Sequence, residues 1–131
     1  MKHISILIIL LLASFSLSAQ TVQIGSWKAD EFTTTYTEKT WDFSESMSVL
    51  TEKSGTYNIV LTYTGGKHKL CLKEAVIKAD GKEIMSASSE KSAGYNPKSI
   101  SYTFELGAVP KKLVLTAKVR TDGGTNSNGK I

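Results

Sequence analysis

The stretch at residues 55–77, GTYNIVLTYTGGKHKLCLKEAVI, decides the fold of this 131-residue chain. Apolar side chains recur at every second position of its first half, at Tyr57, Ile59, Leu61 and Tyr63. A period of two predicts a β-strand with one buried face. Two glycines follow at positions 65 and 66, where they favour the positive φ angles of a tight turn. We therefore expect a β-hairpin here, at the centre of a sheet.

The second half of this stretch changes its phase. Apolar residues occupy even positions up to Leu72 and odd positions from Ala75 onwards, with Lys73 and Glu74 at the change. A one-residue slip would turn the later side chains away from the core. A β-bulge, which inserts one extra residue into a strand, would return them to the core face. We therefore predict a bulge at Lys73 and Glu74.

The rest of the chain repeats the strand pattern. Asp80 and Gly81 form a dipeptide that is typical of two-residue hairpin turns. Residues 99–106 alternate between apolar and polar side chains, and residues 113–119 alternate in a similar way. No segment shows the 3.6-residue apolar repeat of a helix. Short strands joined by turns predict an all-β fold, an antiparallel β-sandwich or jelly roll.

The first 19 residues have the pattern of a secretory signal peptide. A short basic start precedes an apolar run at residues 4–12, and small, hydroxyl-rich residues lead up to Ala19. The apolar run is shorter than the roughly 20 residues that a membrane span needs. Cleavage after Ala19, or alternatively after Ser18, would leave one domain at residues 20–131. We therefore expect a secreted or periplasmic protein without a membrane span.

Charge and cysteine content argue against several classes of protein. The formal net charge is +4, but the basic residues are scattered, which together with secretion argues against nucleic-acid binding. Cys71 is the only cysteine, and we expect it to be a small, buried packing residue. His68 lies three positions away, so the two side chains would point to opposite faces of a strand. We therefore expect no Cys–His nucleophile and interpret His68 as a solvated turn residue.

Patterns that would indicate catalysis are weak. A glycosidase needs two carboxylates held across the scissile bond. Four acids lie near one another in the sequence, at Asp30, Glu31, Asp42 and Glu45. Their spacing does not specify a pair, and the sequence contains neither zinc-ligand spacing nor a phosphate-binding loop. We therefore expect a protein that is not an enzyme.

Three segments carry a resemblance to a known family. They are YTGGKH at residues 63–68, VIKADGKEI at residues 76–84 and VRTDGGTNSNG at residues 119–129. Their order and spacing resemble the small C-terminal β-sandwich module of secreted bacterial hexosaminidases and fucosidases. The resemblance covers about residues 55–131. It implies a galactose-binding-like fold and a non-catalytic, carbohydrate-binding function, with a glycan or glycoprotein as the partner.

The sequence also departs from the pattern of that family. After the DGKEI segment the family carries an acid, a histidine and a glycine, where this chain has Ala87, Ser89 and Lys91. An expected asparagine is replaced by Ile100, and an aspartate of the final loop is replaced by Asn126. These changes would weaken any ligand site that the family builds there. The alternative is therefore a protein-interaction or structural module whose sugar site has decayed.

The loop at residues 122–129 is the first part of the predicted ligand site. It gathers carboxylate, amide, hydroxyl and carbonyl oxygens, which include those of Asp122 and Asn126. Such oxygens are calcium ligands, so calcium is one hypothesis, although a single acid is few for that ion. A tight glycine turn with side-chain hydrogen bonds is another interpretation. In the third, Asp122 and Asn126 hydrogen-bond to sugar hydroxyls.

Aromatic side chains are the second part of the predicted site, because a ring covers the CH face of a sugar while polar groups fix its orientation. The candidates are Trp27, Trp41 and Tyr95, of which the tryptophans have core packing as the alternative. Arg120 ends a strand beside the glycine-rich loop, where it would contact an acidic sugar or pair with Asp122. We predict a shallow site in loops at one end of the sandwich. Its residues would be Trp41, Tyr95, Arg120, Asp122 and Asn126.

Overall fold

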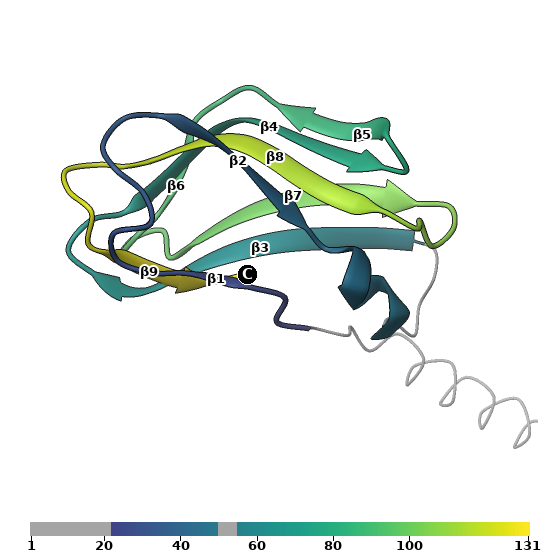
Figure 1. Ribbon diagram of the computed structural model, residues 1–131, viewed down its shortest axis with the longest axis horizontal. Coiled ribbons are helices and arrows are strands. Elements are labelled where there is room, and N and C mark those ends of the chain that lie inside the picture. The colour runs from purple at the N-terminus through teal and green to yellow at the C-terminus, as the bar shows by residue number, and fades with distance from the viewer. Residues whose placement is uncertain (1–21, 50–54) are drawn as a thin grey trace, which may run out of the picture.

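A computed structural model describes residues 22–49 and 55–131 of the chain (Figure 1). The predicted signal peptide therefore lies outside the described residues. Nine strands and one short 3₁₀ helix make up the described elements. They are β1 (Ser26–Trp27), β2 (Thr37–Asp42), η1 (Ser44–Val49), β3 (Gly55–Gly66), β4 (Leu70–Ala79), β5 (Lys82–Ala87), β6 (Lys91–Ala93), β7 (Ser99–Leu106), β8 (Leu113–Thr121) and β9 (Ser127–Lys130). Among these residues, no helix is long and apolar enough to cross a membrane.

The strands form two antiparallel sheets that face each other. One sheet, here called sheet A, has the order β1-β9-β3-β7. The other, sheet B, has the order β2-β8-β4-β5, and β6 also pairs with β4. Figure 1 shows the two layers, with β8 and β4 above β3 and β9. The prediction of an all-β, antiparallel sandwich is confirmed.

The core lies between the sheets and is built by alternating side chains. In β7 every second residue is buried, from Ile100 to Leu106, and the residues between them are exposed. In β3 the side chains of Ile59, Leu61 and Tyr63 point into the same core. Val60, on the opposite face of β3, is 40% exposed, so the outer face of sheet A is open to solvent.

The predicted hairpin between β3 and β4 is wrong. β3 pairs with β7 and β9, whereas β4 pairs with β5, β6 and β8, so the two strands belong to different sheets. Residues 67–69 carry the chain from sheet A to sheet B. The alternation of apolar residues indicates only that each strand covers a core. It is the same whether two strands pair side by side or face each other across that core.

The predicted bulge in β4 is confirmed. Against β8, the register shifts between Lys73, which pairs with Lys118, and Val76, which pairs with Thr116. Glu74 has a φ angle of 50°, in the left-handed region that is uncommon for residues other than glycine. The shift keeps both Leu72 and Ala75 fully buried.

The Asp80–Gly81 turn is also confirmed. Asp80 and Gly81 have φ angles of 51° and 82°, as a type I′ hairpin turn requires, and they join β4 to β5. The Asp80 carboxylate accepts hydrogen bonds from the backbone N–H groups of Lys111 and Lys112, each at 2.9 Å. This turn and the β7–β8 turn therefore meet at one end of the sandwich.

Candidate functional site

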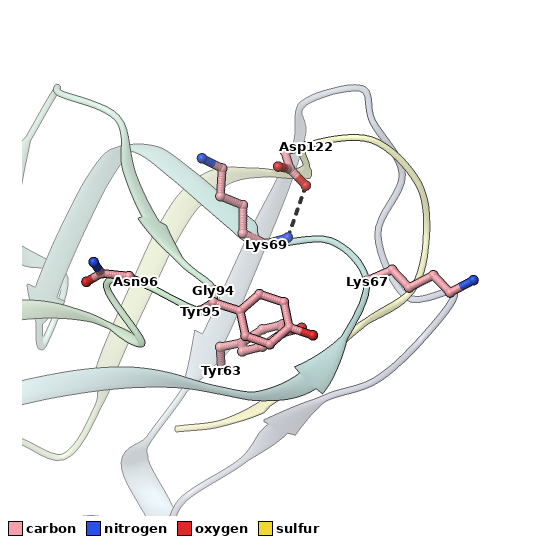
Figure 2. A pocket seen from close by; sticks show the side chains of 7 residues that line it. All are labelled: Tyr63, Lys67, Lys69, Gly94, Tyr95, Asn96 and Asp122. Atoms are coloured by element: carbon pink, nitrogen blue, oxygen red, sulfur yellow. Dashed lines mark hydrogen bonds between the residues drawn. The ribbon is translucent and has the colours of Figure 1, made fainter.

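Three loops meet at the other end of the sandwich, where β3, β6 and β8 end. They are residues 67–69, 94–98 and 122–126. They enclose a hollow of about 310 Å³, which is near the lower limit for small-ligand sites. Figure 2 shows the residues that line it: Tyr63, Lys67, Lys69, Gly94, Tyr95, Asn96 and Asp122.

Tyr95 presents an open aromatic ring at this hollow. Its side chain is 77% exposed, and its ring meets Tyr63 edge to face, with centroids 5.4 Å apart. Both tyrosine hydroxyls donate to the carbonyl of Gly66, that of Tyr95 at 3.3 Å. Tyr63 is buried, so it gives Tyr95 a fixed support while most of the outer ring stays accessible.

Gly94 allows the Tyr95 loop to lie close to the β3–β4 loop. A Cβ atom at Gly94 would stand only 2.7 Å from the Cβ of Lys69, closer than such atoms approach. The N–H of Gly94 also donates to the carbonyl of Pro97 at 2.8 Å, which closes the loop. The position of Tyr95 therefore depends on a glycine that the sequence showed only as a loop residue.

Asp122 is held at the hollow by a reciprocal pair of hydrogen bonds. Its carboxylate Oδ1 accepts the backbone N–H of Lys69 at 3.0 Å, and its own N–H donates to the carbonyl of Lys69 at 3.2 Å. The Nδ1 atom of His68 lies 3.6 Å from the same Oδ1. Asp122 is therefore fixed in place, with about a third of its side chain exposed.

His68 is less solvated than the sequence predicted for this turn residue, since only 30% of its side chain is exposed. Its imidazole ring packs against the backbone of Gly123 and Gly124. A Cβ atom at Gly124 would lie 2.6 Å from Nε2 of the ring, so the two glycines leave the space that the ring fills. Two consecutive glycines beside a histidine-containing loop were the signal that could have indicated this packing.

Arg120 lies outside the hollow, and its predicted pairing with Asp122 is wrong. Its guanidinium is 3.5 Å from the Glu90 carboxylate, and its Cζ is 5.1 Å from the centre of the Tyr36 ring. The Tyr36 hydroxyl donates to Glu90, which is the main cause of the lowered pKa of that carboxyl. Lys73 also lies over the Tyr36 ring, at 4.1 Å. Arg120 therefore belongs to a separate cluster on the outer face of sheet B.

Both tryptophans are core residues. Trp41 is 9% exposed and meets Phe32 edge to face, with ring centroids 6.5 Å apart. Trp27 is almost fully buried, and its indole N–H donates to the Ser127 hydroxyl at 3.0 Å. Neither ring presents a face to solvent, so Trp41 does not contribute an aromatic platform to the hollow.

Asn126 supports the loops through its backbone. Its carbonyl accepts the N–H groups of Lys67 and His68 at 2.9 and 3.0 Å, but the residue does not line the hollow. Of the five predicted site residues, Tyr95 and Asp122 line the hollow, whereas Trp41, Arg120 and Asn126 do not. The sequence interpretation missed Tyr63, Lys67, Lys69 and Asn96 as lining residues.

The oxygens of the 122–129 loop bond to other parts of the protein. The Thr121 hydroxyl donates to the carbonyl of Gly124, and the Asn128 side chain accepts the N–H of Ala29 at 3.0 Å. Within residues 22–49 and 55–131, no group of three or more His, Cys, Asp or Glu side chains could hold a metal ion. The calcium hypothesis from the sequence stays a prediction.

The remaining candidates for chemistry are separated or buried. Asp30 lies at the end of the sandwich that carries the hollow, where the hydroxyl of Thr125 donates to its carboxylate at 2.6 Å. Asp42 is the last residue of β2, so the length of that strand separates the two carboxylates. A six-residue strand spans about 17 Å, well beyond the separation of a glycosidase pair. Cys71 is buried as predicted, and burial raises the pKa of its thiol.

Comparison with protein-family models and with curated proteins gives no match. The resemblance to hexosaminidase and fucosidase modules therefore stays a prediction.

Proposed function

We propose that this chain is a secreted, non-catalytic module that binds glycans at the end of the sandwich where Tyr95 and Asp122 lie. One observation carries the proposal: the accessible ring of Tyr95 and the fixed carboxylate of Asp122 line the same hollow of about 310 Å³. The ring would cover the CH face of a sugar, and the carboxylate would accept hydrogen bonds from its hydroxyls. A shallow site of this kind suits weak binding.

The division of roles follows from the contacts. Tyr63 supports Tyr95 from behind, so the platform loses little conformational freedom when a sugar binds. Asp122 keeps its carboxylate oriented through Lys69, and its exposed part remains available as an acceptor. Asn96 adds an amide at the rim, where donors and acceptors suit pairs of hydroxyls. The separation of Asp30 from Asp42 argues against that pair of carboxylates as hydrolytic groups.

A glycan array tests this proposal. We expect the mature chain to bind at least one class of glycan, and Tyr95→Ala to weaken that binding about tenfold or more, because the stacking surface is lost. Tyr95→Phe is the matched control, since it keeps the ring and should keep most of the affinity. Running the array with calcium and with a chelator separates a metal-dependent site from a metal-independent one.

Two results would contradict the proposal. A blank array for a folded protein would favour the alternative, a protein-interaction or structural module whose sugar site has decayed. Binding that survives Tyr95→Ala unchanged would place any sugar site elsewhere. Circular dichroism of each variant establishes that the sandwich is intact, which matters because Tyr95 contacts the buried Tyr63.

A further inference from the structure

We infer that the sugar bound beside Tyr95 is a terminal, negatively charged residue, and that Lys67 and Lys69 recognise its carboxylate or sulfate group. This inference rests on the proposed function and adds the chemical class of the ligand. The sequence interpretation gave recognition of an acidic sugar to Arg120, which lies in the separate Tyr36 cluster. Here that role belongs to Lys67 and Lys69, in the loop that joins β3 to β4.

The charged groups of the hollow are unbalanced. Two lysines and one aspartate line it, so the formal charge of the lining is positive. The Asp122 carboxylate is already bonded to a backbone N–H of Lys69, and His68 lies beside it. Its negative charge is therefore partly compensated by the protein, whereas both ammonium groups remain available to a ligand.

Neither ammonium group has an ionic partner among the residues that the structure describes. The ion pairs there are Lys118–Glu74 and Arg120–Glu90, and His68 also lies near Asp122, so Lys67 and Lys69 are in none of these contacts. Both lysines are exposed. By contrast, Lys91 donates to the carbonyl of Ser101 at 3.0 Å.

The two lysines extend from the same loop in different directions. Figure 2 shows Lys69 rising above the Tyr63–Tyr95 pair and Lys67 extending to the right, away from it. Their backbone is fixed, because the N–H of Lys67 donates to Asn126 at 2.9 Å and that of Lys69 donates to Asp122 at 3.0 Å. Both side chains are exposed and flexible, so either ammonium group can turn toward an acidic substituent of a sugar stacked against Tyr95.

The size of the hollow indicates a terminal sugar. Its volume of about 310 Å³ is at the small end of the range for ligand sites, so it suits one sugar ring. A hollow of that size leaves little room for a chain that continues in both directions. A charged group at the end of a glycan is also the most accessible position for two surface lysines.

Matched glycan pairs provide the test. The probes are a sialylated and an unsialylated N-acetyllactosamine, a galacturonate oligosaccharide and its methyl ester, and a sulfated and an unsulfated galactoside. We expect binding to favour the acidic member of at least one pair and to weaken as salt increases. Lys67→Gln and Lys69→Gln should each weaken it by about two- to fivefold, since an exposed charge contact contributes little. Which pair responds separates a carboxylate from a sulfate.

Lys111→Gln/Lys112→Gln is the matched control, because these lysines lie in the turn at the opposite end of the sandwich. It removes two positive charges, one more than either single variant, and should still leave binding unchanged. An equal loss in this control would mean that only the net charge matters, and it would overturn the inference. Equal binding of acidic and neutral members that Tyr95→Ala abolishes would overturn the inference but keep the proposed function. Binding to none of these probes, with a hit elsewhere on the glycan array, would overturn the inference alone, and a blank array would overturn both.

Discussion

At the scale of single residues, the least satisfied group in the core is the hydroxyl of Tyr102. The side chain is 2% exposed, and its hydroxyl has no hydrogen-bond partner among residues 22–49 and 55–131. Burial raises its pKa to about 12, because the charged phenolate would lose its hydration. A buried polar group without a partner costs free energy, so the core retains Tyr102 at some loss of stability.

Tyr102→Phe tests this account. We expect the free energy of unfolding near neutral pH to stay the same or to increase by about 1 kcal/mol, because an unpaired hydroxyl is removed. In the wild type the unfolded chain releases the tyrosine proton near pH 10, while the folded chain holds it to about pH 12. The free energy of unfolding of the wild type should therefore fall as pH rises through that interval. It should fall less in Tyr102→Phe, which has no hydroxyl to titrate at this position. Urea unfolding of both proteins at neutral and alkaline pH measures the difference. A clear destabilisation at neutral pH would mean that the hydroxyl is bonded.

At the scale of elements, the 122–126 loop and the 67–69 loop are fitted to each other through His68 and Gly124. The ring of His68 occupies the space that a side chain at Gly124 would need. His68 also lies next to Asp122, which lines the hollow, with its Nδ1 atom 3.6 Å from the Asp122 carboxylate. The geometry of the site therefore depends on two loops that come from different parts of the sequence.

Gly124→Ala should destabilise the protein by about 1–3 kcal/mol, because its Cβ would overlap the His68 ring. Gly107→Ala is the control, since a Cβ atom there meets nothing within 4 Å. In a His68→Ala background the cost of Gly124→Ala should largely disappear. A double-mutant cycle from thermal or urea unfolding measures this coupling. Additive effects of the two substitutions would show that the ring and the glycine do not interact.

The sequence predicted the elements well and their partners less well. The bulge at Glu74 and the turn at Asp80 are local, because each depends on residues that are close in the chain. The β3–β4 hairpin was wrong because burial alternates identically in strands that pair and in strands that face each other. Tyr95 was found because it stands in a polar loop, whereas the burial of Trp41 depends on Phe32 and is not visible in the local sequence.

At the scale of the whole molecule, three carboxyl groups with lowered pKa values should make the folded protein less stable in acid. The carboxyl groups of Asp42, Glu74 and Glu90 have lowered pKa values, caused mainly by hydrogen bonds from Ser44, Lys118 and Tyr36, respectively. The unfolded chain therefore takes up protons at a higher pH than the folded protein does. The stabilisation from these groups is fully present above their ordinary pKa, near pH 4 to 4.5, and is lost as pH falls below it.

We expect the free energy of unfolding to decrease below about pH 4.5 and to decrease less steeply in Glu90→Gln, which removes one of the three titrating groups. Glu105→Gln is a control on the exposed face of β7, and it should keep the wild-type slope. Unfolding curves at several acidic pH values give the slopes. An unchanged slope in Glu90→Gln would mean that its contacts with Tyr36 and Arg120 do not persist in solution.

The order of strands in sheet A also sets when this protein can finish folding. β9, near the end of the sequence, lies between β1 and β3 and pairs with both, so Trp27 meets Gly129 across about a hundred intervening residues. Until residues 127–130 are available, sheet A lacks the inner strand β9. Without it, β1 has no strand to pair with, and β3 lacks its partner on one edge. Contacts of such long sequence separation slow folding, because the loop must close before the contacts stabilise it. A ribosome that has made the first hundred residues has therefore not yet made a protein that can complete its core.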